Sequence, residues 1–418
     1  MSTNFRIALR FLTARKRSML MSLAGIIFGV GFFIVTQAQT TGFERFFIKT
    51  ILGTDGALRI EDKFQNSIFA MAAAGHDAGA SRFEVAAPRE GRKYIEGIEE
   101  PGPMMEALGK FTNVAGVSMV LKGSVVADSS FKNEAAEAFG IKLEDHLAVS
   151  DLSKQILQGS LEDYRGSPQG LLVGVVLAQR LQLSIGDSII LRAKDQQRRY
   201  KVSGIFQTGV RDIDKKRIYM HLGEARSLLQ KATGATFLQI NLFDKDRAPQ
   251  DAVQFENVFK HGAQSWQERE SIWLEVFRAL RVSSALTVST IILISGLGMF
   301  NTLAMLVIEK TKEIAILRSM GYTRQDISRI FIWLGVIVLV LGTVAGWIFG
   351  AGVTYGVSKI PIHIRGVFST DSFQVYSTFW HYFVASITAA VVVMTAAVVP
   401  ARRAARLEPG DIIRGTSQ

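Results

Sequence analysis

The chain has 418 residues, of which 48% are hydrophobic, and its mean hydropathy is +0.21. These values are too apolar for an average soluble protein, and the length allows more than one domain. The formal net charge of +11 could indicate nucleic-acid binding, but much of the basic excess flanks long apolar segments, where anionic lipid head groups are the expected partner. Composition therefore favours contact with a lipid bilayer and no nucleic acid.

Four apolar segments lack Asp, Glu, Lys and Arg, and each approaches or exceeds the roughly 20 residues that cross a bilayer core. They are Leu20–Val35, Ala285–Ile308, Ile330–Val357 and Phe379–Val399. The sequence thus predicts an α-helical membrane protein with four transmembrane helices, at residues 18–42, 281–308, 330–357 and 378–400. The first segment could instead be a cleaved signal peptide, but cleavage would spoil the even number of spans.

Basic residues gather on one side of the predicted spans. The amphipathic segment 1–17 contains five Lys or Arg and no acid, and both the 309–329 segment and the 401–418 tail are rich in Lys or Arg. The 358–377 segment contains only Lys359 and Arg365. Because short cytoplasmic segments carry the Lys and Arg excess, we expect both termini and 309–329 in the cytoplasm, with 43–280 and 358–377 outside.

Residues 43–280 hold enough polar sequence for one large or two small globular domains. Apolar residues that alternate with polar residues predict strands, and apolar residues that recur at helical spacing predict helices. Together they indicate an α+β extracytoplasmic domain. The expected strands are 57–61, 116–122, 188–193, 199–205 and 236–243. The expected helices are 134–138, 172–181 and 223–233, and 272–286 is expected to be an amphipathic helix that continues into the second span. The 70–80 segment has weak periodicity and is expected to be a loop.

The 309–329 segment is a charged, helix-prone stretch between two apolar segments. Ile314, Leu317 and Met320 recur at helical spacing, and Gly321 is a candidate helix stop. Thr323 with Asp326 is a candidate cap for the next helix. The spacing alone fits either a solvated turn or a helix that a cytoplasmic partner grips.

No catalytic motif occurs in the sequence. The nearest approach to a G-x-x-x-x-G-K-[ST] phosphate loop is Gly109-Lys110-Phe111, which lacks the glycine spacing and the hydroxyl. Cysteine is absent and the six histidines form no H-E-x-x-H pattern, so we expect no metal site. We expect no enzyme activity, catalytic residue or cofactor in this chain. The histidines, at 76, 146, 221, 261, 363 and 381, are expected at surfaces or interfaces.

The predicted spans also lack the ionisable residues that mark proton relays and ion-coupled transport. Their most polar residues, Gln37, Asn301 and Thr302, fit helix–helix hydrogen bonds as well as substrate contacts. Small-residue faces are expected to pack helices closely: Gly25 and Gly29 in the first span, and Gly342, Gly346 and Gly350 in the third.

The order of segments in the chain resembles that of the ABC permeases of the MacB/FtsX superfamily. One span is followed by a large external domain and three further spans, with a helical loop between the second and third spans. The lipoprotein-releasing LolC/LolE type is the most similar. Four stretches carry the resemblance: GFERFFIKTILG (42–53), SWQERESIWLEVFRALRV (265–282), EKTKEIAILRSMGYTRQDI (309–327) and PARRAARLEPGDIIRG (400–415). The LAQRLQLSIGDSIILR stretch (177–192) is similar to a helix, turn and strand of these permeases.

The resemblance implies a bacterial inner-membrane subunit with a MacB-like external domain of two subdomains. It also implies a second permease copy or paralogue and a separate ATPase dimer that binds ATP and magnesium. ATP binding would draw the cytoplasmic coupling helices together, and the external domains would change shape by mechanotransmission. The residues expected at the ATPase interface are Glu309, Lys312, Glu313, Ile314, Leu317 and Arg318, with Gly321 ending the helix.

The sequence departs from LolC-type subunits in one place. Their long hairpin captures a periplasmic lipoprotein chaperone, whereas 191–206 leaves room only for a short turn near Asp195 to Arg198. Three functions stay open: release of lipoproteins or other amphipathic cargo, MacB-type efflux with a membrane-fusion protein, and FtsX-like signal transmission across the membrane.

Overall fold

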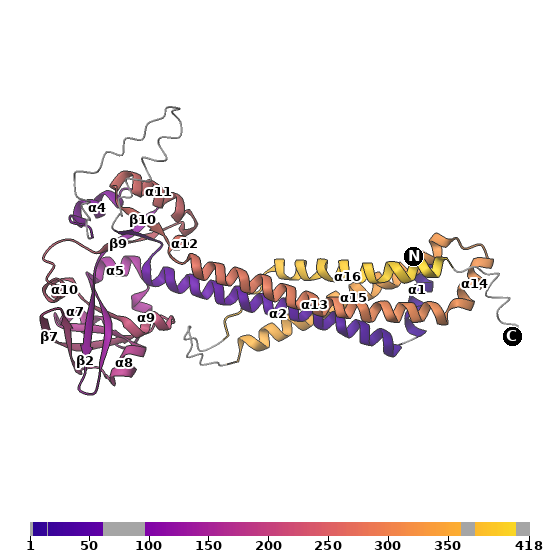
Figure 1. Ribbon diagram of the computed structural model, residues 1–418, viewed down its shortest axis with the longest axis horizontal. Helices are drawn as coiled ribbons and strands as arrows, with labels where there is room; N and C mark the ends of the chain where they lie inside the picture. The colour runs from indigo at the N-terminus through magenta and orange to yellow at the C-terminus, as the bar shows by residue number, and fades with distance from the viewer. Residues whose placement is uncertain (1–2, 15, 62–96, 361–372, 407–418) are drawn as a thin grey trace, which may run out of the picture. The chain divides into compact units, whose positions relative to one another are not determined.

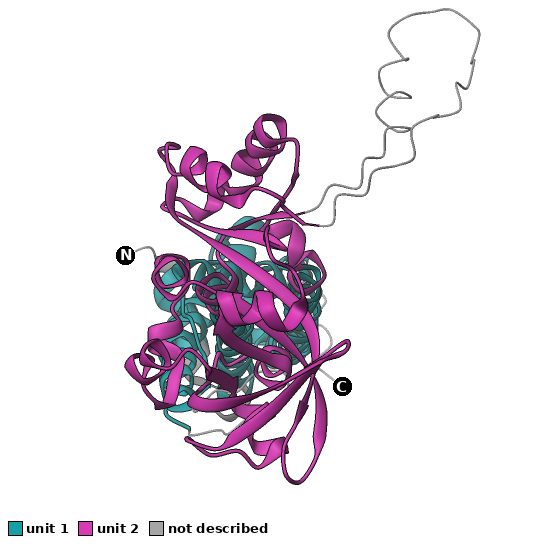
Figure 2. Ribbon diagram, turned by 90° about the vertical axis from the view of Figure 1, so that its left-hand side faces the viewer, with its two compact units in different colours: residues 1–46, 275–362, 371–418 teal, residues 47–274, 363–370 magenta. Residues whose placement is uncertain are grey.

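The computed structural model describes residues 3–14, 16–61, 97–360 and 373–406. The chain divides into two units, which Figure 2 shows in different colours. Figure 1 labels the helices and strands. Unit 1 comprises Met1–Phe46, Glu275–Ile362 and Asp371–Gln418, and unit 2 comprises Phe47–Leu274 and His363–Thr370. The predicted 70–80 loop, His76, His363 and the last part of the 400–415 stretch lie outside the described residues.

Helices make up the described part of unit 1. They are α1 (Thr3–Ala14), the first part of α2 (Lys16–Asp55), most of α13 (Ser271–Glu309), α14 (Thr311–Ser319), α15 (Arg324–Ser358) and α16 (Phe379–Ala405). Four of them, α2, α13, α15 and α16, are long and apolar enough to cross a membrane, in agreement with the four predicted spans. The 40 residues of α2 measure about 60 Å at 1.5 Å per residue, twice a bilayer core, so the helix extends well beyond its span.

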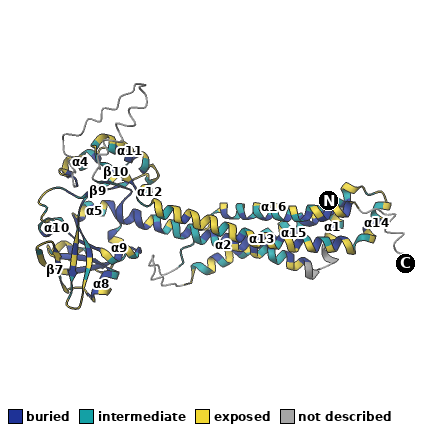
Figure 3. Cartoon of the chain, in the orientation of Figure 1, coloured by how far each residue is buried: buried dark blue, intermediate teal, exposed yellow. Residues whose placement is uncertain are grey.

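Exposed residues follow α13 and α16 along much of their length (Figure 3), and many of them are apolar. On α13 they include Leu286, Ile294, Leu297 and Ile308, and on α16 they include Ile387 and Val391. In water such surfaces would favour association or aggregation, whereas lipid tails or another apolar helix can cover them. The pattern is that of membrane helices.

Glycines allow the long helices to approach one another closely. A Cβ on Gly346 of α15 would lie 2.9 Å from the Cβ of Val30 on α2, and a Cβ on Gly350 would lie 3.2 Å from the Cα of Gly31. A Cβ on each of the other three expected glycines would lie 2.7–2.8 Å from a side chain of a neighbouring helix: Ser295 for Gly25, Ile292 for Gly29 and Ile26 for Gly342. These glycines pack helices of the same chain.

Unit 2 is built on a ten-stranded mixed sheet. The path is β10-β1-β9-β2-β3-β8-β5-β7-β4, with β6 pairing β2 and β7. The strands are β1 (Leu58–Glu61), β2 (Val114–Asp128), β3 (Asn133–Ile141), β4 (Ile156–Gly159), β5 (Gly170–Gly174), β6 (Ser188–Ala193), β7 (Gln196–Phe206), β8 (Arg217–His221), β9 (Phe237–Leu242) and β10 (Gly262–Ser265).

Short helices connect these strands. They are α4 (Pro101–Leu108), α5 (Leu143–Val149), α6 (Leu152–Gln155), α7 (Leu161–Gly166), α8 (Val175–Leu181), α9 (Arg211–Lys216), α10 (Leu222–Leu229), η1 (Lys245–Arg247), α11 (Ala248–Phe259) and α12 (Trp266–Arg269). Separate hydrophobic clusters divide the unit: one joins β1, β9 and β10 to α4 and α11, and the others lie around β2, β3 and β5–β8. This is the expected α+β domain, with its two parts on one sheet.

The five strands expected from alternation are confirmed; 188–193 has the expected ends, and the other four have shifted ends. The predicted helix at 134–138 is wrong, because this segment is part of β3 and pairs with β2 from Asn133 to Ile141. Its Glu and Ala residues favour a helix locally, but nine cross-strand pairs override that weak preference. The predicted 172–181 helix begins only at Val175, after strand β5, and the 223–233 helix ends at Leu229.

His146 is a second correction, because it lies in the core of unit 2 and not at a surface. Its side chain is fully buried, and neither ring nitrogen has a hydrogen-bond partner. The ring lies 5.2 Å from that of Tyr219. Burial, followed by the nearby Arg217 charge, lowers the pKa of His146 from 6.5 to about 3, against the opposing effect of Asp55.

Replacing Gly346 by alanine should destabilise the helix bundle, since the new methyl group would overlap Val30 and overpacking costs about 1–3 kcal/mol. The matched control is Gly352→Ala on the same helix, where a Cβ meets nothing within 4 Å. We expect a lower unfolding midpoint only for Gly346→Ala, measured on the purified chain in detergent. Equal midpoints for the two variants would contradict the packing role.

Acid should weaken unit 2 through His146. The folded side chain stays neutral down to about pH 3, whereas in the unfolded chain it takes up a proton near pH 6.5. Stability is therefore lost as the pH falls below 6.5, by about 2 kcal/mol at pH 5. The unfolding midpoint should fall further between pH 7.5 and 5 in the natural protein than in His146→Leu, and equal pH dependence would refute this assignment.

Candidate coupling site

The segment between α13 and α15 folds as the short helix α14. Helix α13 ends at Glu309, α14 runs from Thr311 to Ser319, and Gly321 follows with φ of +101°. This left-handed conformation is strained for residues with a side chain, which explains the glycine at the helix end. Thr323 and Asp326 then form a reciprocal capping box at the start of α15. The predicted stop and cap are both confirmed.

The two faces of α14 differ in a way that helical spacing did not predict. Ile314 is 1% exposed and Ala315 is also buried, and Ile314 belongs to the hydrophobic core of unit 1. Leu317 packs against the same core and is half-buried. The exposed apolar side chains are Ile316 at 59% and Met320 at 74%. A partner would therefore meet Ile316 and Met320, while Ile314 anchors the helix to its own chain.

The charged residues of this segment occupy different positions around α14. Glu309, Lys312 and Glu313 are exposed, and Lys310 forms an ion pair with Glu313. Arg318 is half-buried and donates from Nη1 to the carbonyl oxygen of Ala405, 3.3 Å away. Arg318 therefore tethers α14 to the end of α16. Lys312 and Glu313 remain exposed to solvent.

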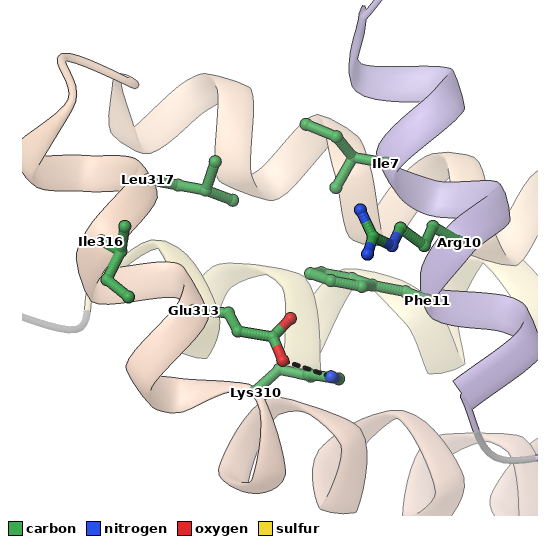
Figure 4. A pocket seen from close by; sticks show the side chains of 7 residues that line it. All are labelled: Ile7, Arg10, Phe11, Lys310, Glu313, Ile316 and Leu317. Carbon is green, nitrogen blue, oxygen red and sulfur yellow. Dashed lines mark hydrogen bonds and ion pairs between the residues drawn. The ribbon is translucent and has the colours of Figure 1, made fainter.

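A cavity of about 540 Å³ lies between α14 and the N-terminal helix α1 (Figure 4). Its apolar lining comes from Ile7 and Phe11 on α1 and from Ile316 and Leu317 on α14. Charged side chains complete the lining, namely Arg10, Lys310 and Glu313. The Lys310 ammonium also lies 5.7 Å from the centre of the Phe11 ring.

Sequence reasoning did not identify the α1 wall of this cavity or Ile316. The available signal was the amphipathic pattern of α1, in which Ala8 and Phe11 are buried while Arg6, Leu9 and Arg10 are exposed. Helix α1 packs extensively on α15, with Phe5 edge-on to Trp333 at 5.5 Å. Only the tertiary structure brings α1 and α14 to one cavity.

The site has a mixed apolar and charged lining. It combines exposed apolar side chains with charges of both signs around a concave cavity, features found at protein interfaces. Within the described ranges, no group of three or more His, Asp or Glu could hold a metal ion. The arrangement can bind a partner's side chain in the cavity and pair charges at its rim.

The polar residues of the predicted spans mainly contact other helices. Thr302 and Ser22 have their hydroxyl oxygens 3.0 Å apart. Gln37 donates from Nε2 to the carbonyl oxygen of Arg281 and to the hydroxyl of Ser284, both at 3.1 Å. Asn301 is exposed. Gln37 also lines a second cavity of about 400 Å³ among α2, α13 and α16.

Comparison with curated proteins finds similarity along nearly the whole chain. A lipoprotein-releasing system transmembrane protein LolC from Xylella fastidiosa is 24% identical over 98% of each chain. A LolE protein of the same system from Haemophilus influenzae is 22% identical over 99% of each chain. An uncharacterized ABC transporter permease, YknZ of Bacillus subtilis, is 24% identical over 98% of each chain.

Among solved structures, the periplasmic region of MacB from Actinobacillus actinomycetemcomitans matches with a TM-score of 0.35 and 11% identity, over 54% of this chain and 95% of that one. The extracellular domain of YknZ matches with a TM-score of 0.30 and 14% identity, over 39% of this chain and 87% of that one.

Two family models account for most of the chain. The MacB-like periplasmic core domain matches residues 19–257, more than half of the sequence. The FtsX-like permease C-terminal model matches residues 285–409, which include α14 and most of α13, all of α15 and all of α16. The chain therefore belongs to the family of ABC-transporter permeases in which a MacB-like periplasmic core domain is combined with an FtsX-like permease C-terminal region.

Proposed function

We propose that this permease is driven by a separate ATPase that docks on α14 and on the cavity between α1 and α14. The exposed pair Ile316 and Met320, beside the 540 Å³ cavity, carries the proposal. The absence of a phosphate-loop motif from the sequence supports an outside source of ATP hydrolysis, with ATP and magnesium bound by the partner.

The same proposal sets the orientation of the chain. Both termini and α14 lie in the cytoplasm of a bacterium, the protein crosses the inner membrane four times, and unit 2 lies outside the cytoplasm. The support is the Lys and Arg excess in segments 1–17, 309–329 and 401–418, since positively charged short segments stay inside. The docking surface is then on the side where ATP is available.

For the cargo, we propose a lipidated protein or another amphipathic molecule taken from the outer leaflet. The LolC and LolE relatives are described as parts of lipoprotein-releasing systems, and the similarity covers nearly all of this chain. Closure of the ATPase dimer would draw two α14 helices together, one from each of two permease copies or paralogues. Movement along the membrane helices would then change the external domains by mechanotransmission.

A periplasmic chaperone is not needed for this proposal. The β6–β7 connection consists of Lys194 and Asp195 alone, with Lys194 at φ of +50°. The turn thus begins one residue before the predicted 195–198 turn and has two residues where four were predicted. A two-residue turn presents little surface for capturing a folded partner, so release to a chaperone would need another surface.

Export in the manner of MacB, with a membrane-fusion protein, is the second candidate. A macrolide export protein MacB of Psychrobacter cryohalolentis is 23% identical over 213 residues, which cover 49% of this chain and 30% of that protein. Signal transmission of the FtsX type is a third candidate, because the FtsX-like model covers the C-terminal region. A fusion-protein partner would favour export, and an external hydrolase partner would favour signalling.

The docking surface predicts the effect of Ile316→Asp. A charge in place of an exposed apolar side chain of the proposed docking surface should weaken ATPase co-purification at least tenfold, as hot-spot changes exceeding about 2 kcal/mol do. The matched control is Gln325→Asp, which adds the same charge at another exposed position, outside the cavity lining. Undiminished ATPase binding by Ile316→Asp would remove α14 as the docking helix.

Cargo is tested by depleting the chain from its natural host. Lipoproteins that normally reach the outer membrane should then accumulate in the inner-membrane fraction, because their extraction has stopped. Restoring the natural chain, but not Ile316→Asp, should return them to the outer membrane. An unchanged lipoprotein distribution, together with loss of export of another compound, would favour the MacB-type function.

A further inference from the structure

The last turns of α2 form part of the core of unit 2. Residues Phe47–Asp55 belong to that unit, and Leu52 joins its hydrophobic cluster with β1, β9 and β10. The ring of Phe47 lies 5.6 Å from that of Trp273. The backbone is also fixed, since the Asp151 amide donates to the Gly53 carbonyl oxygen at 2.6 Å.

Asp55, the last residue of α2, carries a buried negative charge. The Arg217 guanidinium donates to both of its carboxylate oxygens, at 2.7 and 3.4 Å. The Gln239 amide donates to Oδ1 at 3.3 Å, and Arg59 forms an ion pair at 3.7 Å. A carboxylate is unfavourable at the C-terminal end of a helix dipole, so the cationic partners are what hold it there.

The partners of Asp55 come from separated parts of the sheet. Gln239 is on β9 and Arg59 is on β1, whereas Arg217 opens β8, and β2 and β3 lie between β9 and β8. The Arg217 guanidinium also lies 4.2 Å from the centre of the Phe139 ring on β3. One carboxylate therefore connects the end of α2 to both parts of unit 2.

The buried position makes this connection rigid. Burial, the largest single effect, lowers the pKa of Arg217, but the charge of Asp55, the nearby Tyr219 and the hydrogen bonds to both together raise it above its usual value. Both members thus stay charged, and separating them would leave the buried Arg217 without its carboxylate and Asp55 with only the longer Arg59 ion pair, an unfavourable state. The end of α2 and the sheet must move together or break this pair.

We infer that the Asp55–Arg217 ion pair is a positioning element that transmits movement of α2 to the external sheet. This inference rests on the proposed mechanotransmission, and it adds a mechanical role for two residues that lie outside the proposed docking surface. Loss of the pair should leave ATP hydrolysis intact and disconnect it from the response of unit 2.

The test compares Asp55→Asn with Asp128→Asn in the full permease–ATPase complex in lipid nanodiscs. Asp128 also forms a two-point ion pair, with Arg192 at 2.6 and 3.1 Å, but it lies on β2 and not on α2. The chain has no cysteine, so Val253→Cys on exposed α11 accepts a single environment-sensitive fluorophore. The measured quantities are ATP hydrolysis and the fluorescence change on adding ATP.

We expect Asp55→Asn to keep at least half of the ATP hydrolysis and to lose at least 90% of the fluorescence change. Asp128→Asn should keep both, and Asp55→Glu should restore part of the response. Should Asp55→Asn fail to fold, Arg217→Lys, which keeps the charge and loses the two-point contact, takes its place. A full fluorescence change in the variant that breaks the Asp55–Arg217 pair overturns the inference. The absence of any fluorescence change in the natural complex, while ATP is hydrolysed, also overturns it.

Hydrogen exchange on the permease alone separates this inference from the proposed function. Breaking the pair should speed amide exchange in residues 48–55 at least tenfold relative to Asp128→Asn, with no ATPase present. If no ATPase co-purifies with the natural chain, the proposed function fails. The ion-pair connection is tested independently of that result, and equal amide exchange in the two variants overturns it.

Discussion

Close approach between membrane helices is the constraint on which unit 1 depends. Lipid tails are as apolar as leucine, so burial of apolar area does little to bring such helices together, and contact relies on packing and interhelical hydrogen bonds. Helix α2 meets this requirement with glycine against α15, where Gly31 and Gly350 face each other. Its hydroxyl contact between Ser22 and Thr302 fastens it to α13.

Charge is distributed to suit this packing. The apolar segments contain no Asp, Glu, Lys or Arg, so the described helices offer no relay of ionisable groups through the bundle interior. Strongly buried charge occurs instead in unit 2, where Asp55 and Arg217 satisfy one another. The proposed outside energy source and the proposed mechanical link at the end of α2 are consistent with this distribution.

The coupling segment shows how far local signals extend. Gly321, Thr323 and Asp326 set the helix end and the next cap, because these effects depend on neighbouring residues only. Spacing did not show which face of α14 is buried, since Ile314, Leu317 and Met320 share a helical stripe but have different surroundings. Ile314 enters the core of unit 1 and Met320 stays exposed, a difference created by helices distant in sequence.

The sequence alone determined the four membrane helices, the family and five of the ten described strands of the external domain, because apolar length and alternation are local properties that backbone hydrogen bonding enforces. Only the tertiary structure decided that 134–138 is a strand, that His146 is buried and that α1 and α14 enclose a cavity. It alone paired Asp55 with Arg217, 162 residues apart. The physical reason is that burial and pairing depend on contacts between distant residues, which composition and spacing do not contain.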